Sequence, residues 1–291
     1  MKKNIFFVLF ISLLAACNSS TGSQNRTDST KSKEAVAEKN KIDSGGVTPE
    51  MDTPVNNAAA ILAKKQVPVL CFHHIREPKP TSSETTKSFF ITPAQFATLM
   101  KALKDSGYQT ILPDQLYNYL AHNRPLLPKP VMLTFDDTDE EQFTVAAPEM
   151  KKNGFKGVFF IMTVSIGKPN YMTKEQIKEL SDEGNAVESH TWDHHMVTKY
   201  KGDDWNIQFV KPRKTIQDIT GKPAEYFAYP YGVWNEAAFP ELKKAGFKMA
   251  FSLAQKRDTK EPLYTVRRML VPTQWSLAGT MRAMKETFKL D

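Results

Sequence analysis

The stretch Val131-Met132-Leu133-Thr134-Phe135-Asp136-Asp137 ends a short apolar run with two adjacent carboxylates. A short run that is continuous rather than alternating is typical of a strand covered on both faces. In a fold built from βα units, the carboxyl ends of the strands carry the active site. Adjacent side chains face opposite ways along a strand, but where the strand ends both can reach one cleft. Asp136 and Asp137 are therefore candidate site residues; the alternative is a helix N-cap pair.

Similar apolar runs recur along the chain, with helical patterns between them. Repeated βα units predict a parallel sheet with helices outside it. A closed or partly closed (β/α) barrel is the first expectation, and a doubly wound open sheet is the alternative. The further runs predicted as strands are 67–72, 157–162, 186–189, 226–229, 249–253 and 263–270.

Three segments carry helix start and stop signals. Thr92 precedes a proline, with a glutamine three residues after the threonine, which predicts a capping box. Thr173 is followed by Gln176 in the same way, and this helix is expected to end at Gly184. A third helix is expected over residues 235–246.

Histidines cluster in two places. His190, His194 and His195 lie within six residues, and on a helical turn the first two would share a face. His73 and His74 follow the apolar run 67–72. A strand-end carboxylate with two histidines offers one oxygen and two nitrogens, which suits a hydrolytic metal ion with positions left open for water. A second carboxylate could act as general base and a further histidine as proton donor, which predicts metal-assisted hydrolysis.

The first sixty residues differ in composition from the rest. Residues 1–16 combine two lysines with a short apolar stretch, which predicts a secretory signal. The stretch Leu14-Ala15-Ala16-Cys17 resembles the lipobox of bacterial lipoproteins, and this resemblance implies cleavage before Cys17 and its lipidation; the alternative is an ordinary signal with a chance cysteine. Residues 17–60 lack Phe, Trp and Tyr and are expected to form a disordered tether. The catalytic domain is assigned to residues 67–291.

Composition excludes several classes of protein. Hydrophobic residues make up 41% of the 291 and aromatic residues 11%, so the chain can build a core and is not disordered throughout. Two cysteines cannot support a disulfide scaffold. The net charge of +7 is a mild excess and gives no reason to expect nucleic acid as a partner. No motif implies a protein partner.

Three motifs, in this order, resemble those of the polysaccharide deacetylase family, carbohydrate esterase family 4. Thr134-Phe135-Asp136-Asp137 matches the first, and His190-Thr191-Trp192-Asp193-His194 resembles the second. Phe227-Ala228-Tyr229-Pro230-Tyr231-Gly232 resembles the third. The resemblance implies a distorted (β/α)7-type barrel and a divalent metal ion, most often Zn²⁺.

The resemblance also implies a role for each matching residue. Asp137, His190 and His194 would bind the metal, and Asp136 would be the base that activates water. Pro230 and Tyr231 would shape the groove, with backbone at Tyr231 holding the oxyanion. The implied reaction removes the acetyl group from an N-acetylated sugar.

Two features depart from the family. Ala228 stands where the third motif usually has the arginine that orients the base, and Arg268, or its neighbour Arg267, is a hypothetical substitute. No histidine follows His195 to act as the late general acid. The poly-β-1,6-N-acetylglucosamine deacetylases, which the chain resembles most, carry this acid on an N-terminal strand of a circularly permuted barrel. That resemblance implies His73 as the acid, with His74 as the fallback.

The expected protein is an exported enzyme, lipid-anchored to a bacterial envelope membrane, that deacetylates N-acetylglucosamine units of a polysaccharide. Two alternatives stay open. One is a catalytically inactive glycan-binding lipoprotein, and the other is a deacetylase of peptidoglycan or another acetylated glycan.

Overall fold

The computed structural model describes residues 55–253 and 256–290. The predicted signal peptide, the lipidation site Cys17 and most of the predicted tether lie outside the described residues. No helix within the described ranges is both long and apolar enough to cross a membrane.

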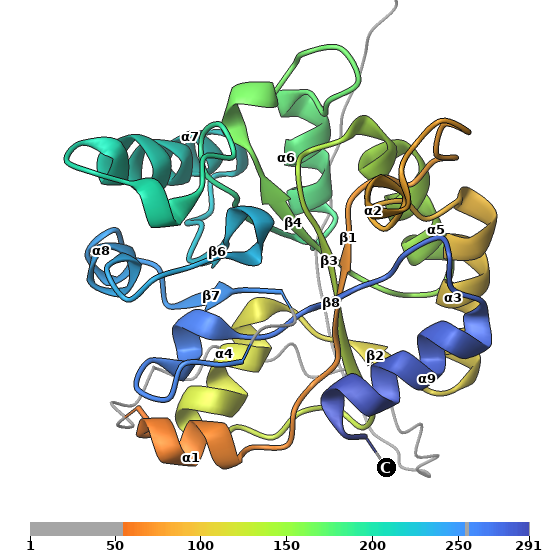
Figure 1. The fold of residues 1–291 in the computed structure, drawn as a ribbon, viewed down its shortest axis with the longest axis horizontal. Helices are drawn as coiled ribbons and strands as arrows, with labels where there is room; N and C mark the ends of the chain where they lie inside the picture. Colours follow the sequence, from red (N-terminus) through yellow and green to blue (C-terminus); the bar gives the residue numbers. More distant parts are fainter. Residues whose placement is uncertain (1–54, 254–255, 291) are drawn as a thin grey trace, which may run out of the picture. The chain divides into compact units, whose positions relative to one another are not determined.

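The core of the fold is a curled, all-parallel half-barrel sheet (Figure 1). Its strand order is β7-β6-β5-β4-β3-β1-β8, and the short β2 also pairs with β3. The strands are β1 (Val69–Phe72), β2 (Gln109–Thr110), β3 (Pro130–Phe135), β4 (Val158–Ile161), β5 (Ala186–Ser189), β6 (Tyr226–Ala228), β7 (Met249–Phe251) and β8 (Met269–Leu270). This arrangement confirms the predicted distorted (β/α)7-type barrel.

The two edges of the sheet approach each other just before β8. An isolated parallel bridge joins Phe251 of β7 to Val266. The amide of Val266 donates to the carbonyl of Ala250 at 3.0 Å, and the amide of Ser252 donates to the carbonyl of Val266 at 2.8 Å. The chain then runs into β8, which pairs with β1. The arginine pair 267–268 is therefore carried on the segment that spans the gap.

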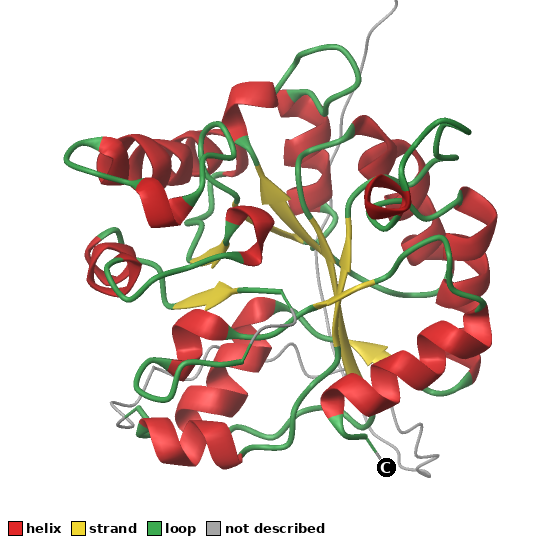
Figure 2. Ribbon diagram, viewed as in Figure 1, coloured by secondary structure: helices red, strands yellow, loops and turns green. Residues whose placement is uncertain are grey.

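Helices flank these strands, most of them on the outside (Figure 2). They are α1 (Ala58–Ala63), α2 (Glu84–Lys87), α3 (Pro93–Asp105), α4 (Pro113–His122), α5 (Ala147–Lys152), α6 (Lys174–Asp182), α7 (Lys211–Thr220), α8 (Ala238–Lys244) and α9 (Leu277–Phe288). Of these, α1 and α4 also pack against the inner face of the curl. The capping boxes predicted at Thr92 and Thr173 are both present, at the starts of α3 and α6. The third expected helix, 235–246, corresponds to the shorter α8.

Apolar side chains fill both faces of the sheet. One cluster joins the outer face to α3, α6 and α9, and includes Leu133, Phe135 and Phe159. A second fills the inside of the curl, where Met132 and Phe160 pack with Leu116 of α4 and Ile61 of α1. Both faces of each central strand are thus buried, which explains the continuous apolar runs in the sequence.

Two predicted segments differ from the structure in kind, and not only in where they end. The run 263–270 is not one strand, because Pro262–Thr265 forms a 3₁₀ turn, Val266 makes an isolated bridge to Phe251, and the strand itself is only Met269–Leu270. Pro262, immediately before this run, has a fixed φ that suits the first position of a helical turn. The predicted tether, residues 17–60, overlaps α1, in which Asn57 caps an alanine-rich turn and Ile61 is buried. Alanine has the highest helix propensity, and burial of Ile61 supplies the tertiary contact that so short a helix needs.

Candidate functional site

The candidate residues gather at the carboxyl ends of neighbouring strands. His73 follows β1, Asp136 and Asp137 follow β3, His190 follows β5, and Pro230 lies two residues past β6. Because all these strands are parallel, their carboxyl ends meet at one edge of the sheet. The structure therefore brings together residues that are up to 157 positions apart in the sequence.

Asp136 and Arg268 form a buried, two-point ion pair. Arg268 Nη1 donates to Asp136 Oδ1 and Nη2 donates to Oδ2, both at 2.7 Å. Neither side chain is more than 3% exposed. The remaining nitrogen, Nε, donates to the carbonyl of Ser252 at 3.2 Å, so the guanidinium is held from two sides. A fork of this kind fixes both the position and the rotation of a carboxylate.

The structure distinguishes the two arginines that the sequence left as alternatives. Arg268 lies under Asp136, and its guanidinium carbon is 5.4 Å from the centre of the Phe160 ring inside the curl. Arg267 lines a separate hollow with Val67 and Phe288. The side chains of adjacent residues in an extended segment point in opposite directions, which explains why Arg267 and Arg268 lie in different surroundings.

The charge pair also sets the ionisation of the candidate base. Burial by itself raises the pKa of Asp136, but Arg268 and the nearby His190 outweigh it and hold that pKa below the usual value. Asp136 is thus a carboxylate at neutral pH despite being buried. It can accept a proton.

Asp137, His190 and His194 present three ligand atoms to one point. One carboxylate oxygen of Asp137 and one ring nitrogen of each histidine all lie within 4.8 Å of one another. Asp137 Oδ1 is 3.4 Å from Nε2 of each histidine. Nε2 of His190 and Oδ1 of Asp137 are buried and make no hydrogen bond in the described structure. Buried polar atoms normally have partners. A metal ion would be the partner that these two atoms lack. This donor set therefore fits the metal that the family resemblance implies.

A hydrogen bond to the backbone orients the His190 ring for metal binding through Nε2. Its other ring nitrogen, Nδ1, lies 2.8 Å from the carbonyl of Ala228, to which it can only donate. This contact fixes the tautomer in which Nε2 carries a free lone pair, as is typical of metal-bound histidines. For His194, burial and then the charge of His190 lower the pKa to about 4, which keeps its imidazole neutral.

The loop after β5 has a different shape from the expected helical turn. Thr191 and His194 both have positive φ angles, 71° and 65°, so residues 190–194 do not form a helix. The amide of His194 donates to Thr191 Oγ1 at 3.0 Å, and Gln208 donates to Asp193 at 2.8 Å. These contacts bring the two imidazoles together, with ring centres 4.9 Å apart, without helical geometry.

His73 and His74 face different surroundings. His73 Nε2 is 3.9 Å from Asp136 Oδ2, and its ring packs edge-on against Phe89. His74 turns away, with Nδ1 2.7 Å from Asp139 Oδ2. Of the two histidines, only His73 is placed beside the carboxylate pair. Burial is the main cause that lowers its pKa.

Gln142 is a site residue that the sequence analysis missed. Its side-chain Nε2 donates to the carbonyl of His73 at 3.0 Å and also to the carbonyl of Asp136. Gln142 is fully buried at the start of a π-helical segment, Gln142–Ala146. It ties the end of β1 to the end of β3. π-Helical segments are frequent at functional sites, but no local sequence pattern signals this one.

Pro230 and Tyr231 border the histidine pair. They lie in a 3₁₀ turn, Pro230–Gly232, in which Tyr231 has a φ of 60°. Tyr231 is 53% exposed, and the centre of its ring is 4.4 Å from that of His194. The turn thus forms an open wall of the site.

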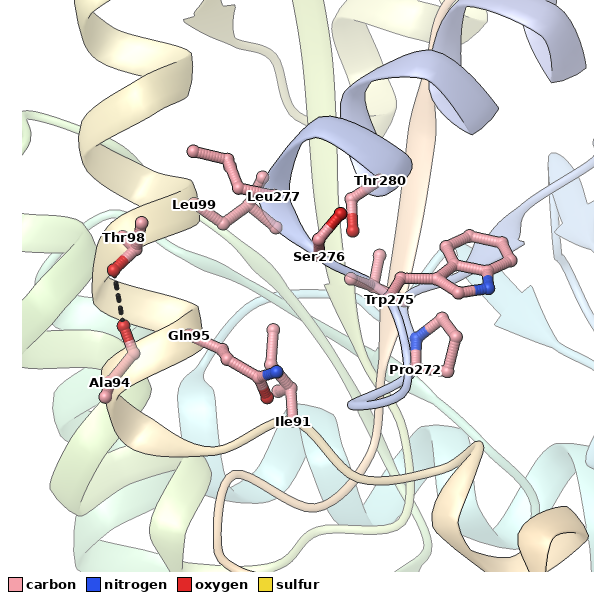
Figure 3. Close-up of a pocket in the computed structure, with 11 residues that line it drawn as sticks. Ile91, Ala94, Gln95, Thr98, Leu99, Pro272, Trp275, Ser276, Leu277 and Thr280 are labelled. Carbon is pink, nitrogen blue, oxygen red and sulfur yellow. Dashed lines mark hydrogen bonds between the residues drawn. The ribbon is translucent and has the colours of Figure 1, made fainter.

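A separate hollow of about 260 Å³ lies between α3 and the start of α9 (Figure 3). Gln95, Trp275 and Ser276 are among its lining residues, and none of the lining residues is acidic, basic, histidine or cysteine. It offers neither a metal ligand nor a base, so we place the chemistry at the strand ends.

The fold and the site define a (β/α)-barrel protein with a buried carboxylate–arginine pair beside a three-residue donor set. Residues 123–250 match the family model for polysaccharide deacetylases. A poly-β-1,6-N-acetyl-D-glucosamine N-deacetylase of Staphylococcus aureus is 30% identical over 208 residues, 66% of this chain and 71% of that protein. The chain belongs to the polysaccharide deacetylase family.

Solved structures show the same fold. The deacetylase PplD of Streptococcus pyogenes, in complex with acetate, superposes with a TM-score of 0.68 at 21% identity over 75% of this chain and 98% of that one. IcaB of Ammonifex degensii gives a TM-score of 0.64 at 23% identity, over 78% and 97% of the two chains.

Proposed function

We propose that this protein is a zinc-dependent N-deacetylase that removes acetyl groups from N-acetylglucosamine units of an exported polysaccharide. Family membership and the name of the Staphylococcus aureus relative support the reaction and the sugar. The observation that carries the proposal is the Asp136–Arg268 pair beside the donor set of Asp137, His190 and His194.

Asp137, His190 and His194 would hold the metal. One carboxylate oxygen and two imidazole nitrogens are a common donor set for catalytic zinc, which keeps a position open for water. A bound zinc ion would lower the pKa of water and polarise the acetamide carbonyl.

Asp136 and His73 divide the proton transfers. Asp136 accepts a proton from the attacking water, and Arg268 holds its carboxylate in place for this step. Attack on the acetamide carbon gives a tetrahedral intermediate. His73 donates a proton to the departing nitrogen as the C–N bond breaks, and the products are acetate and a free amine. His73 needs a proton on Nε2 for this, and that atom faces Asp136 at 3.9 Å.

Pro230 and Tyr231 would contact the substrate. The backbone of the turn at Tyr231 would stabilise the oxyanion as charge develops on the acetamide oxygen. The exposed ring beside His194 would form a wall for the sugar.

We also propose export and membrane anchoring. The signal-like residues 1–16 and the lipobox-like sequence ending at Cys17 support lipidation in a bacterial envelope membrane, and residues beyond Cys17 would act as a tether. Two or more acyl chains on one residue give stable anchoring without a spanning helix.

The geometry favours an active enzyme over an inactive glycan-binding protein. That alternative rests on Ala228 in the third motif and on the absence of a histidine after His195. Arg268 contacts the candidate base directly, and His73 Nε2 lies 3.9 Å from Oδ2 of the same carboxylate. Arg268 is thus a candidate for the role of the third-motif arginine, and His73 is a candidate for the role of the late histidine.

The test measures acetate release by the purified protein from β-1,6-linked N-acetylglucosamine oligomers, chitin oligomers and peptidoglycan, each with zinc and with a chelator. Zinc-dependent release from the first substrate alone is the expected result. Release only from peptidoglycan would keep the reaction and replace the substrate. No release from any substrate by zinc-loaded protein would favour the glycan-binding alternative.

A further inference from the structure

The three proposed metal ligands come from loops that do not follow neighbouring strands. Asp137 follows β3, whereas His190 and His194 follow β5, and β4 lies between these two strands in the sheet. Strands two positions apart are separated by roughly 10 Å, yet the three ligand atoms lie within 4.8 Å of one another. Both loops must therefore reach over the end of β4, and the contacts that hold them there set the spacing of the ligands.

Thr138 attaches the first of these loops to the end of β4. It is fully buried, and its Oγ1 accepts a hydrogen bond from the amide of Met162, the residue after β4, at 2.8 Å. The same hydroxyl donates to the Met162 carbonyl at 3.4 Å. The carbonyl of Thr138 accepts from the amide of Met172 at 3.0 Å. The residue that directly follows Asp137 is thus held through both its side chain and its backbone.

The turn after β4 continues this connection to the second loop. It is the 3₁₀ turn Thr163–Ser165, which begins directly after the residue that Thr138 contacts. The amides of its first two residues donate to the carbonyls of Thr191 and Trp192, at 3.2 and 2.8 Å. Both acceptors lie between the two histidine ligands in the sequence. A short path of hydrogen bonds therefore joins the loop of Asp137 to the loop of the histidines.

The backbone of the first loop adopts a conformation that needs such contacts. Asp137 and Thr138 have φ angles of 78° and 74°, in the left-handed region. Aspartate tolerates this region, but a β-branched residue such as threonine rarely adopts it. Backbone strain of this kind persists only where the surrounding structure holds it in place. The hydrogen bonds from Thr138 to Met162 and Met172 are contacts of that kind.

We propose that Thr138 is a positioning residue of the metal site, which sets the distance between the Asp137 carboxylate and the two histidines through the Met162 backbone. Its hydroxyl bonds to Met162 rather than to a ligand side chain, so it acts through the residues that it holds. The inference rests on the proposed function, because it takes Asp137, His190 and His194 as metal ligands. Metal affinity depends strongly on contacts outside the ligands themselves, because these contacts orient the ligands.

The test compares Thr138→Val with Thr138→Ser in the purified protein. Valine matches the shape of threonine but removes the hydroxyl that the Met162 amide contacts, whereas serine keeps it. Zinc affinity is measured by competition with a chelating dye. We expect Thr138→Val to bind zinc about tenfold or more weakly than the parent, as is typical when an outer contact of a metal site is lost. Thr138→Ser should bind zinc nearly as tightly as the parent.

Thr220→Val is the matched control, because Thr220 makes the same kind of contact elsewhere. Thr220 is also buried, and its hydroxyl accepts a hydrogen bond from the amide of Lys222 at 3.1 Å. It is the last residue of α7, which leads into β6, so it lies toward the amino ends of the strands and away from the site. We expect Thr220→Val to lose stability to urea, as Thr138→Val does, and to keep the parental zinc affinity.

The outcomes distinguish a positioning role from a purely structural one. Parental zinc affinity in Thr138→Val, an equal loss in Thr220→Val, or an equal loss in Thr138→Ser would each overturn the inference. Thr138→Ala also lacks the hydroxyl and places no branched side chain at this φ, so it replaces the valine variant if that protein does not fold. Zinc affinity is measured without substrate, so a failure to release acetate would count against the proposed reaction alone. A parent that binds no zinc would overturn both.

Discussion

Arg268 donates a hydrogen bond of 2.7 Å to each carboxylate oxygen of Asp136, although the two residues are 132 positions apart in the sequence. The contact is buried and forms where the segment after Val266 enters the sheet beside β1. An arginine from outside the third motif thus reaches the carboxylate at the end of the first motif.

Replacing Arg268 should change the pH dependence of the reaction. Arg268 holds the pKa of Asp136 below its usual value, so the base stays ionised and the parent keeps its activity down to low pH. In Arg268→Gln that pKa rises, and the acidic limb of the kcat/KM profile should move to higher pH. The buried carboxylate also loses its partner, at a cost of about 3–5 kcal/mol in the free energy of unfolding. Arg267→Gln is the matched control, and a shift of the limb in both variants would contradict the assignment.

Asp137→Asn should lower metal affinity without unfolding the protein. Asparagine tolerates the positive φ of 78° at this position, so the backbone can remain as it is. The variant loses the only anionic ligand of the donor set, and we expect zinc affinity to fall by about tenfold or more. Zinc content after dialysis and a competition titration measure this. Undiminished zinc binding would remove Asp137 from the ligand set.

His73→Gln and His74→Gln should differ, although the residues are neighbours. Loss of a general acid typically lowers kcat by about 10²–10⁴-fold, and we expect this for His73→Gln with bound zinc retained. His74 pairs with Asp139 instead, so its replacement should have a much smaller effect. Single-turnover rates of the two zinc-loaded variants provide the comparison, and the reverse order would make His74 the acid.

Gln142→Met should weaken both the fold and the site. Methionine is similar in size but cannot donate to the carbonyls of His73 and Asp136, which would leave buried acceptors unsatisfied. We expect a loss of about 1–3 kcal/mol in urea unfolding, with a lower kcat and an unchanged zinc content. Gln95→Met, which removes a capping contact of α3, is a control for simple destabilisation. An equal stability loss in both with an equal fall in kcat would contradict a positioning role for Gln142.

Local patterns predicted much of this structure. The run that ends at Asp136 and Asp137 predicted a buried strand with carboxylates at its carboxyl end, and the capping boxes at Thr92 and Thr173 predicted where two helices begin. These features depend on residues close together in the sequence. Their repetition predicted a parallel sheet with helices outside it, and the family resemblance implied the distorted barrel.

The parts that the sequence could not determine depend on distant contacts. The fork between Arg268 and Asp136 requires the closing segment to align with β1, and Gln142 acquires its role from the ends of two strands. The spacing of His190 and His194 would put both on one face of a helical turn, but contacts to Gln208 hold this segment in another shape. The sequence does not show which way the side chains of the adjacent His73 and His74 point. The fold at the end of β1 directs His73 toward Asp136 and His74 toward Asp139.

The most direct test of the central claim is Asp136→Asn, measured for zinc content and for acetate release from β-1,6-linked N-acetylglucosamine oligomers. Asparagine keeps the shape of the side chain but cannot accept a proton from water. We predict that the variant retains the zinc content of the parent and releases no measurable acetate. Loss of zinc would make Asp136 a ligand rather than the base, and turnover at the parental rate would show that the base lies elsewhere.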